Sequence, residues 1–591
     1  MKNRRGGSRS RMRLDSAGDA FRSRARFAAF SGTIIFALLE FCSAPVTNAS
    51  EPAPETVIAA HGLLVTDSAP ASEVGVVILK QGGNAVDAAV ATALALAVTF
   101  PEAGNLGGGG FMLVHPANDA EPVCIDYRET APAAATASMF SFGERRLGHK
   151  VVGVPGTLRG LELAHQRFGK LPWELLVGPA IRLAQEGFEF DVPLADALNE
   201  LVASSGEFAE LKRVFGKEAG AATWRAGDRF IQPDLARTLQ LIRDQGAAAF
   251  YEGEIAERIV AEMELGGGLI TRADLAGYQA KVRTPLRGTY RGYQVLGAPP
   301  PSSGGTATIE ALNILERFDL RSHDRWSPRT GHLLIEALRR AYCDRARWLG
   351  DPDFVEVPPE LTTKEYAQHL ADEIDLAHAT PSERLAPEIA LAAEGAETTH
   401  FSVIDAEGMA VANTYTLEDS YGSRVVVRGA GFLLNNEMGD FNWRPGHTDR
   451  RGHIGTPANT IAPGKRMLSS QSPTIVLRDG HVVFVTGSPG GRTIISTVTG
   501  LLINVLEYDL DLRQGLAAPR LHHAWFPDRV LFEGAGDSAH TALVEQLRGL
   551  GHVVDGAPHK QGSANSIWVD RTTGERRGVA DPRRAGRAVG Y

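Results

Sequence analysis

The last third of this 591-residue chain is a series of short β-rich runs, and this series restricts the possible folds more than any other feature. The runs are HFSVID, MAVANTYT, RVVVRGAGFLL, TIVLRDG and HVVFVTGS, and Asp-Gly or Gly turns separate them. Short strands joined by tight turns predict a mainly antiparallel sheet. The next segment, RTIISTVTGLLINVLEY, follows Gly490-Gly491 and has the length and apolar spacing of a helix.

The part of the chain before this sheet is mainly helical. Residues 72–79 and 84–98 carry Ala, Val and Leu at helical spacing, with a Gly-Gly break between them. The segment NLGGGGFMLVH then opens a hairpin whose second strand is VCIDYRE, and Arg128 falls at the end of that strand. Residues 155–349 are predicted to be mostly helical. Helices before and after a mainly antiparallel sheet predict a layered α/β sandwich rather than a doubly wound fold.

The composition and charge exclude several classes of protein. Hydrophobic residues make up 43% and charged residues 22%, which is typical of a folded globular chain. The net charge is −9, and the residues before Ser50 include nine basic and three acidic side chains, so the remainder carries about −15. Because no basic stripe offsets this charge, we do not expect nucleic acid as a partner.

The first 49 residues are predicted to be a signal peptide. An Arg-rich stretch ends at Arg26, an apolar run covers residues 27–39, and small residues suited to signal peptidase follow at 47–49. We expect export and cleavage, which gives a periplasmic or secreted protein; the alternative is an uncleaved anchor. The other apolar stretch, residues 88–100, is too short to span a bilayer, so no stable membrane span is expected after leader removal.

Several common active-site motifs are absent. Thr486 stands two places before Ser488 in TGSPGG, where a G-x-S-x-G elbow needs a glycine. The glycines of NLGGGG are not followed by the Lys-Ser/Thr of a phosphate loop. His522 and His523 are adjacent, so on a strand they point to opposite faces and are predicted to be structural. Cys124 and Cys343 are expected to be buried free thiols. The sequence indicates no metal and no organic cofactor.

Two threonines remain as candidate nucleophiles. Thr398 and Thr399 stand at the start of the strand HFSVID, directly after an Ala/Glu/Pro-rich segment at 377–397 that is predicted to be an exposed linker. A threonine hydroxyl can be activated by its own free α-amino group, which requires a cut immediately before that threonine. A flexible linker tolerates such a cut. The spacing alone leaves two interpretations, a strand-start pair or an N-terminal nucleophile.

Motifs along the chain support the second interpretation. The segments GNLGGGGFML, IDYRETAP, PPPSSGG, WLGDPDF, TTHFSV, LLNNEMGDF, KRMLSSQSPTI, TGSPGG and GVADPRRAGRAVGY resemble, in this order, those of the gamma-glutamyltransferase family. The resemblance covers nearly the whole chain after the leader. It implies an α+β fold, a four-layer αββα sandwich of the N-terminal-nucleophile hydrolase type, formed jointly by two subunits cut from one precursor. The cut would lie between Glu397 and Thr398, giving a large subunit of residues 50–397 and a small one of residues 398–591.

The resemblance also assigns catalytic residues. It implies that Thr398 is the nucleophile, that Thr416 orients it, and that the backbone of Gly490 and Gly491 forms the oxyanion hole. These glycines lie between a predicted strand and a predicted helix, where free N–H groups and the positive end of a helix dipole converge. Taken alone, SPGG would be only a tight turn.

A γ-glutamyl donor presents both a carboxylate and an ammonium group, so its site needs both signs of charge. Arg128 matches the family's carboxylate-binding arginine, and a guanidinium fork fits that group. Ser469 and Ser470 match the serine pair that adds hydroxyl donors. Glu437 and Asp440 match the positions that hold the ammonium.

Two positions depart from the common family pattern. Many members have Asn where this chain has Glu418, although Glu also occurs there, and an extra carboxylate favours the ammonium. Residues 445–459 have the length of the family's active-site lid, and Arg451 stands where an aromatic residue often closes it. Since a lid controls water access, these changes bear on the balance of hydrolysis against transfer.

Three functions follow from these observations. The first is a gamma-glutamyl hydrolase and transferase that acts on glutathione and related compounds and passes the group to water or to an amino acid or peptide acceptor. The second is a glutaryl-cephalosporin-type acylase, which the zwitterion-binding set disfavours because a glutaryl group has no α-amino group. The third is a non-catalytic homologue that does not mature, which the intact Thr398 disfavours.

Overall fold

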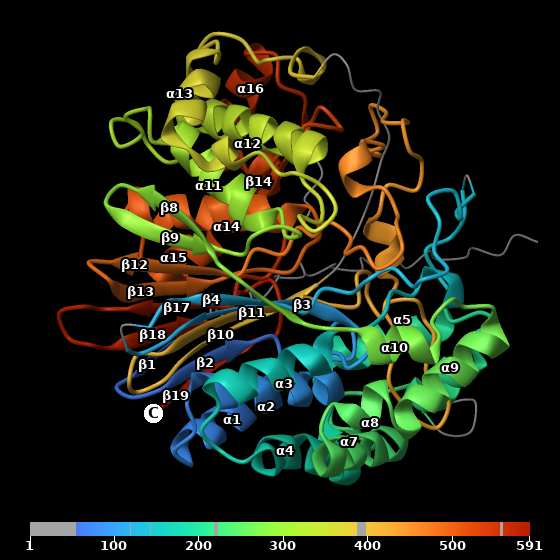
Figure 1. Cartoon of the computed structure of the whole chain (residues 1–591). Helices are drawn as coiled ribbons and strands as arrows, with labels where there is room; N and C mark the ends of the chain where they lie inside the picture. The colour runs from blue at the N-terminus through green and yellow to red at the C-terminus, as the bar shows by residue number, and fades with distance from the viewer. Residues whose placement is uncertain (1–54, 119, 142, 218–222, 387–397, 556–559) are drawn as a thin grey trace, which may run out of the picture. The chain divides into compact units, whose positions relative to one another are not determined.

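The computed structural model describes residues 55–118, 120–141, 143–217, 223–386, 398–555 and 560–591, drawn in colour in Figure 1. The predicted leader and Glu397 lie outside these residues. Among the helices in the described ranges, none is long and apolar enough to cross a membrane.

Two seven-stranded sheets form the centre of the fold, and every pairing within them is antiparallel. The first sheet has the order β1 (Thr56–Ala59), β18 (Arg576–Val579), β17 (Ser566–Val569), β13 (His481–Thr486), β12 (Thr474–Arg478), β9 (Tyr293–Gly297) and β8 (Leu286–Tyr290). The second has the order β19 (Arg587–Gly590), β2 (Leu63–Thr66), β10 (Thr399–Ile404), β11 (Ala410–Thr416), β3 (Gly109–His115), β4 (Val123–Asp126) and β7 (Lys281–Arg283).

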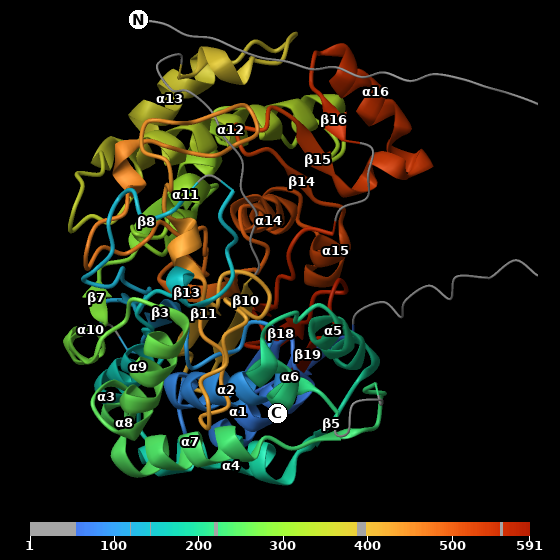
Figure 2. The same ribbon diagram turned by 90° about the vertical axis from the view of Figure 1, so that its right-hand side faces the viewer.

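Helices cover the outer face of each sheet, so the order of layers is helix, sheet, sheet, helix (Figure 1). The helices on the side of the second sheet are α1 (Ala69–Lys80), α2 (Ala85–Thr99), α3 (Thr157–Phe168), α4 (Trp173–Glu186), α5 (Val192–Ala203), α6 (Ala209–Phe215), α7 (Pro233–Gln245), α8 (Ala248–Tyr251), α9 (Glu254–Gly266) and α10 (Arg272–Gly277). Those on the side of the first sheet are α11 (Gly304–Leu315), α12 (Pro328–Trp348), α13 (Lys364–Asp372), α14 (Thr493–Leu502), α15 (Leu512–Ala517) and α16 (Thr541–Gly549). Figure 2 shows the same separation of the two helical layers from the side.

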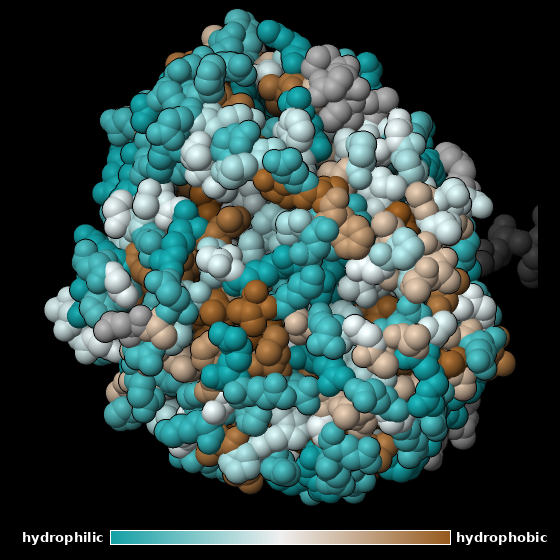
Figure 3. Space-filling model, viewed as in Figure 1, coloured by the Kyte–Doolittle hydropathy of each residue, from teal (hydrophilic) through white to brown (hydrophobic). Residues whose placement is uncertain are grey.

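Two small sheets complete the fold. Strands β14 (Leu521–His522), β15 (Val530–Phe532) and β16 (Val554–Asp555) form one, and β5 (Phe188–Glu189) and β6 (Arg229–Phe230) form the other. On the face shown in Figure 3, apolar residues form separate small patches among polar side chains, which is ordinary for a folded protein surface.

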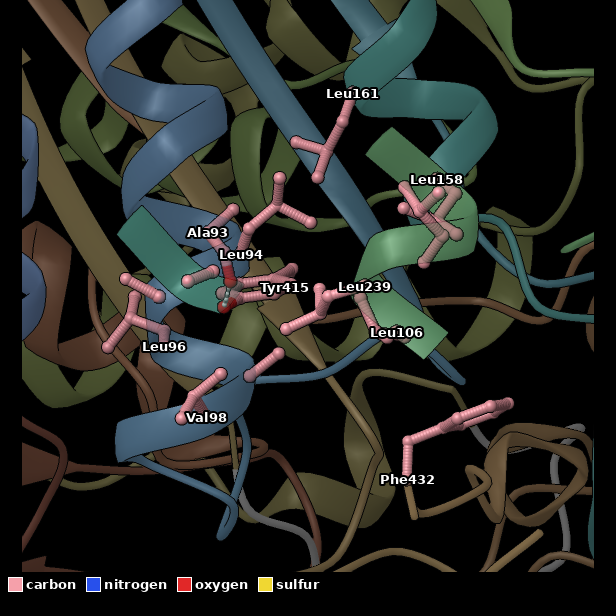
Figure 4. Packing of buried hydrophobic residues seen from close by; sticks show 14 of the residues in the cluster. Ala93, Leu94, Leu96, Val98, Leu106, Leu158, Leu161, Leu239, Tyr415 and Phe432 are labelled. Carbon is pink, nitrogen blue, oxygen red and sulfur yellow. Dashed lines mark hydrogen bonds between the residues drawn. The ribbon is translucent and has the colours of Figure 1, made fainter. Parts of the chain in front are cut away.

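Three hydrophobic cores match the three interfaces between the layers. Phe401 and Val403 of β10 pack with α1 and α2, whereas Leu113 of β3 packs with Ile475 and Val485 of the opposite sheet. A third cluster joins the outer face of the first sheet to α11, α12 and α14. Helix α2 is buried along its whole length, and the Tyr415 hydroxyl of β11 donates to its Ala93 carbonyl at 3.0 Å (Figure 4).

Most of the element predictions are confirmed. The antiparallel layered sandwich, the helix pair α1 and α2, the hairpin of β3 and β4, and the helix after Gly491 are all present. Cys124 and Cys343 are buried, as predicted. His522 and His523 are also buried and bond Ser496 and Asp528 respectively.

One prediction is wrong, and two are confirmed only in part. The segment RVVVRGAGFLL is not a strand, because Gly429 and Gly431 adopt positive φ and only an isolated Val426–Leu433 bridge forms. Residues 155–349 also contribute β7, β8 and β9, so both sheets draw strands from both parts of the chain. Of the exposed linker predicted at 377–397, only residues 377–386 are described; most of these are exposed or partly exposed, whereas Ser382 and Ala386 are buried.

Candidate active site

Thr398 lies directly before β10 in the middle of the second sheet, and only 3% of its surface is exposed. Strands β10 and β11 pair so that Thr399 faces Tyr415. In an antiparallel pair the next residues outward face each other, so Thr398 stands opposite Thr416, the last residue of β11. The two hydroxyl-bearing residues therefore meet at one end of the sheet.

The glycine-rich segment before β3 shapes the backbone around Thr416. A Cβ at Gly108 would lie 2.0 Å from the Thr416 carbonyl oxygen, so no larger residue fits there. Asn105 donates to the same carbonyl at 2.9 Å and accepts from the Gly108 N–H at 3.0 Å. On the other side, the Glu418 N–H donates to Thr416 Oγ1 at 2.8 Å. The motif NLGGGG thus holds the residue that faces Thr398.

A buried aspartate holds the start of β10. Thr399 Oγ1 donates to Asp67 Oδ2 at 3.1 Å, and Ser563 Oγ and Asn565 Nδ2 donate to Asp67 Oδ1 at 2.8 and 3.0 Å. Asn565 Nδ2 also donates to the His400 carbonyl at 3.0 Å. Burial raises the pKa of Asp67, and these donors oppose that effect. The network fixes the residue next to Thr398 without touching Thr398.

His400 faces the space between the sheets and is not a base for Thr398. Its Nδ1 lies 2.8 Å from Thr414 Oγ1 and its Nε2 lies 3.1 Å from Ser402 Oγ. Burial lowers the pKa of His400 to about 3, so the ring is neutral at ordinary pH.

Arg128 follows β4 and is fully buried. Its Nη1 lies 2.6 Å from Glu437 Oε2, its Nη2 pairs with Asp440, and its Nε donates to the Met467 carbonyl at 3.3 Å. Burial opposes the charge of Arg128, but Glu437, Asp440 and the neighbouring Glu129 together raise its pKa. The guanidinium is therefore a permanent cation.

The carboxylates around Arg128 outnumber it. Burial raises the pKa of Glu418 and of Glu437 well above the ordinary value; Arg128 opposes the shift at Glu437, and nearby Asp440 raises both further. Oxygens of Glu418, Glu437 and Asp440 lie within 4.8 Å of one another, close enough to surround a cation. The guanidinium of Arg128 already pairs with two of these three.

Ser469 and Ser470 lie on a segment tied to the motif PPPSSGG. The Ser469 N–H donates to the Pro301 carbonyl at 2.9 Å, and the Ser303 N–H donates to the Ser469 carbonyl at 2.7 Å. Both serines are buried, with 2% and 9% of their surface exposed. This backbone pairing holds the two serine hydroxyls beside Arg128 in one pocket.

Gly490 and Gly491 connect β13 to α14 in a conformation that favours glycine. Their φ values are +123° and +53°. Within the described part of the chain, neither N–H donates a backbone hydrogen bond. The Gly490 carbonyl accepts from the N–H of Thr493, the first residue of α14. Their N–H groups therefore stand at the N-terminus of a helix, where an anion is favoured.

One small pocket collects most of the predicted site residues. Its walls include eight of the ten, namely Arg128, Thr398, Thr416, Glu418, Asp440, Ser469, Ser470 and Gly491. The other two do not line the pocket: Glu437 contacts Arg128, and Gly490 directly precedes the wall residue Gly491 in the sequence. The remaining wall residues are Arg345, Gln471, Arg492 and Ile494.

Sequence reasoning missed these four residues. Gln471 and Arg492 directly follow predicted residues in the motifs SSQS and GGR, so the motifs could have indicated them. Arg345 lies in the middle of α12, and nothing in its local sequence distinguishes it from the other arginines of that helix.

The predicted lid, residues 445–459, lies beside the pocket. Asn459 Nδ2 donates to the Asp440 carbonyl at 2.6 Å, and Arg492 Nη1 donates to the Gly452 carbonyl at 3.1 Å. Arg451 is exposed and lines neither the site pocket nor the larger cavity next to it. That larger cavity includes Arg146 and Trp443 in its walls.

Comparison with known proteins agrees with this geometry. Antiparallel sheets between helical layers, with a threonine at the start of a central strand beside free glycine N–H groups, define the class of N-terminal-nucleophile hydrolases. The family model described as gamma-glutamyltranspeptidase matches residues 71–591, and the chain belongs to that family.

Curated relatives and solved structures cover most of the chain. The glutathione hydrolase proenzyme of Escherichia coli (strain K12) is 44% identical over 536 residues, which is 89% of this chain and 91% of that protein. The protein of the same name from Pseudomonas aeruginosa is also 44% identical, over 88% of this chain and 92% of its own. The crystal structure of a cephalosporin acylase from Bacillus halodurans superposes with a TM-score of 0.81 at 26% identity, and covers 93% of this chain and 99% of that one.

Proposed function

We propose that the chain is an autoprocessed gamma-glutamyl hydrolase and transferase that acts on glutathione and related γ-glutamyl compounds. The observation that carries the proposal is the shared pocket. Thr398, Arg128, Asp440 and both serines line one small cavity, although they come from four separate segments of the sequence. The names of the curated relatives support the same activity.

The first reaction of this site is cleavage of its own chain. Thr398 Oγ attacks the carbonyl carbon of Glu397, and the C–N bond breaks as the hydroxyl proton passes to the departing nitrogen. Water then opens the ester, which leaves a carboxylate on Glu397 and a free α-amino group on Thr398. The products are a large subunit of residues 50–397 and a small subunit of residues 398–591 that stay together as a heterodimer.

The donor is held by both of its α-substituents. Arg128, Ser469 and Ser470 bind the carboxylate, and Glu437, Asp440 and Glu418 hold the ammonium. Arg128 already pairs with Glu437 and Asp440, so an incoming zwitterion exchanges one set of ion pairs for another. This exchange limits the cost of removing the donor charges from water.

In turnover the free amine of Thr398 takes the proton from Thr398 Oγ as the oxygen attacks the δ-carbonyl of the donor. The N–H groups of Gly490 and Gly491 stabilise the oxyanion, and Thr416 orients the nucleophile. The donor C–N bond then breaks, and the leaving amine takes the proton. Water or an acceptor amine attacks the resulting ester and releases Thr398. None of these steps uses a metal or an organic cofactor.

We further propose that residues 1–49 are a cleaved leader and that the mature protein is periplasmic or secreted. The Arg-rich and apolar stretches before Ser50 support this assignment.

The experiment that tests the proposed function compares two anilides, one with a γ-glutamyl group and one with a glutaryl group. The zwitterion site predicts that kcat/KM is at least a hundredfold higher for the γ-glutamyl compound. Asp440→Asn is expected to reduce that ratio, because only the γ-glutamyl compound has the ammonium group that Asp440 holds. Arg128→Lys is expected to lower kcat/KM for both compounds, because both carry the carboxylate and a lysine side chain lacks the guanidinium fork. A higher kcat/KM for the glutaryl compound would instead support an acylase.

A further inference from the structure

Arg345 is a second buried arginine at the donor pocket. It lies on α12, far in sequence from the serine pair, and 7% of its surface is exposed. It lines the pocket that contains Thr398 and also the small cavity on the other side of Asp440. Neither the motifs nor the proposed mechanism gives it a role.

The partners of Arg345 are serine hydroxyls. Its Nη2 donates to Ser470 Oγ at 3.0 Å, and its Nε donates to Ser303 Oγ at 2.9 Å. In the described part of the chain no carboxylate forms an ion pair with it, whereas Arg128 has three such partners. Its positive charge is therefore not neutralised locally.

These contacts determine in which direction the hydroxyl groups donate. Arginine has only donors, so Ser303 and Ser470 must each accept from Arg345. The Ser303 hydroxyl donates its own hydrogen to the Ser469 carbonyl, and the Oγ–O distance is 2.6 Å. The Ser470 hydroxyl keeps its hydrogen for another acceptor. Ser469 Oγ likewise accepts, from the Gln471 N–H at 3.1 Å, and keeps its own hydrogen.

We propose that Arg345 is a positioning residue that orients the Ser470 hydroxyl, directly and through Ser303 and the Ser469 backbone, so that both serines donate into the pocket. The inference rests on the proposed function, in which that pocket receives the α-carboxylate of a γ-glutamyl donor. It also assigns a role to the motif PPPSSGG, because Ser303 of this motif accepts one of the two hydrogen bonds that Arg345 donates to serine hydroxyls. Arg345 acts through the serines and takes no part in bond breaking.

The test is a double-mutant cycle with Arg345→Gln, Ser470→Ala and the double variant. KM and kcat are measured with a γ-glutamyl anilide, and Kd is measured for L-glutamate by titration calorimetry. Arg345→Gln is expected to raise KM and Kd about tenfold, the effect of losing a hydrogen bond to a charged group. kcat is expected to change less than threefold, and most of the increase in KM is expected to be lost in the Ser470→Ala background, with a smaller part left because Arg345 also acts through Ser303.

Two further variants separate positioning from a structural role. Arg347→Gln removes a positive charge from the same helix outside the pocket and is expected to leave KM unchanged. Ser303→Ala leaves the bond from Arg345 to Ser470 in place and is expected to have a smaller effect than Arg345→Gln. If Arg345→Gln prevents folding, Arg345→Lys takes its place in the cycle.

Additive effects in the cycle, or a fall in kcat with KM unchanged, would overturn the inference. The wild-type protein could also bind L-glutamate but fail to cleave the anilide. If the Kd values for L-glutamate then showed the expected coupling between Arg345 and Ser470, the proposed reaction would be overturned but the role of Arg345 would be supported.

Discussion

At the scale of single residues, the site concentrates carboxyl groups around one arginine. Arg128 contacts Glu129, Glu437 and Asp440, and burial raises the pKa of both glutamates above the ordinary value. Such a cluster can bind an ammonium group, because an added cation favours the ionised form of these carboxyl groups. Without that cation, ionising the buried carboxyl groups is unfavourable for the fold, and this cost depends on pH.

Glu129 makes that cost measurable. Its pKa is raised to about 8, mainly by burial, and nearby Asp440 and Asp126 also raise it while Arg128 opposes. The folded state therefore holds this proton more tightly than the unfolded chain does. The free energy of unfolding should fall as pH rises from about 4.5 towards 8.

We predict that, between pH 5 and pH 8, the free energy of unfolding falls less in Glu129→Gln than in the wild type, by about 1–3 kcal/mol. Thermal unfolding of both proteins at pH 5 and pH 8 checks this, with exposed Glu407→Gln as the control. If wild type and Glu129→Gln lose the same stability between the two pH values, Glu129 does not carry the proton assigned to it.

At the scale of elements, strand β10 directly follows the proposed nucleophile Thr398 and is fixed from both sides. Asp67, which follows β2, bonds Thr399, and Asn565 bonds both Asp67 and the His400 carbonyl. A displacement of about 1 Å at a reacting atom can reduce a rate a hundredfold. The anchoring of β10 therefore matters for the first reaction of the chain.

We predict that Asp67→Ala slows self-cleavage at least tenfold, because Thr399, Ser563 and Asn565 all lose an acceptor. Asp67→Asn keeps one oxygen and is expected to have a smaller effect. Ser563→Ala removes one bond of the network and serves as the matched control. The cleavage rates are measured from the appearance of the two fragments on a denaturing gel over time. Cleavage of Asp67→Ala at the wild-type rate would contradict the role of this network.

The sequence predicts elements well where a local pattern determines them. Strand alternation in HFSVID puts Phe401 and Val403 on one face and His400 on the other, and in the structure the face with Phe401 and Val403 packs against the helices. RVVVRGAGFLL has strand-like composition, but two glycines with positive φ turn the backbone before a ladder can form. Strands β7, β8 and β9 have only three to five residues, and they form because neighbouring strands offer partners, which a local pattern does not reveal.

The same distinction applies to the site. Resemblance to a family located Thr398, Arg128, Asp440 and the glycines because each lies in a specific motif. Arg345 could not be predicted, since its role depends on the packing of α12 against a segment more than a hundred residues later.

At the scale of the whole molecule, both sheets combine strands from before and after Thr398. In the second sheet β2 and β3 flank β10 and β11, and the C-terminal strand β19 pairs with β2. In the first sheet β9 pairs with β12, and β1 with β18. Cleavage before Thr398 would therefore leave two fragments with interleaved strands and shared cores.

We predict that the cleaved fragments co-elute in gel filtration and unfold in a single thermal transition. Separating them would expose the apolar faces of both sheets, at a cost far above that of a typical subunit interface. Separation of the fragments under native conditions would contradict this arrangement.

The most direct test of the account is intact-mass spectrometry of the purified protein beside a Thr398→Ala variant, with both assayed on a γ-glutamyl anilide. We predict two fragments in the wild type, the smaller one beginning at Thr398, and one uncut inactive chain in the variant. An uncut wild-type chain that hydrolyses the anilide would contradict the nucleophile assigned here, and an uncut inactive chain would contradict the catalytic function itself.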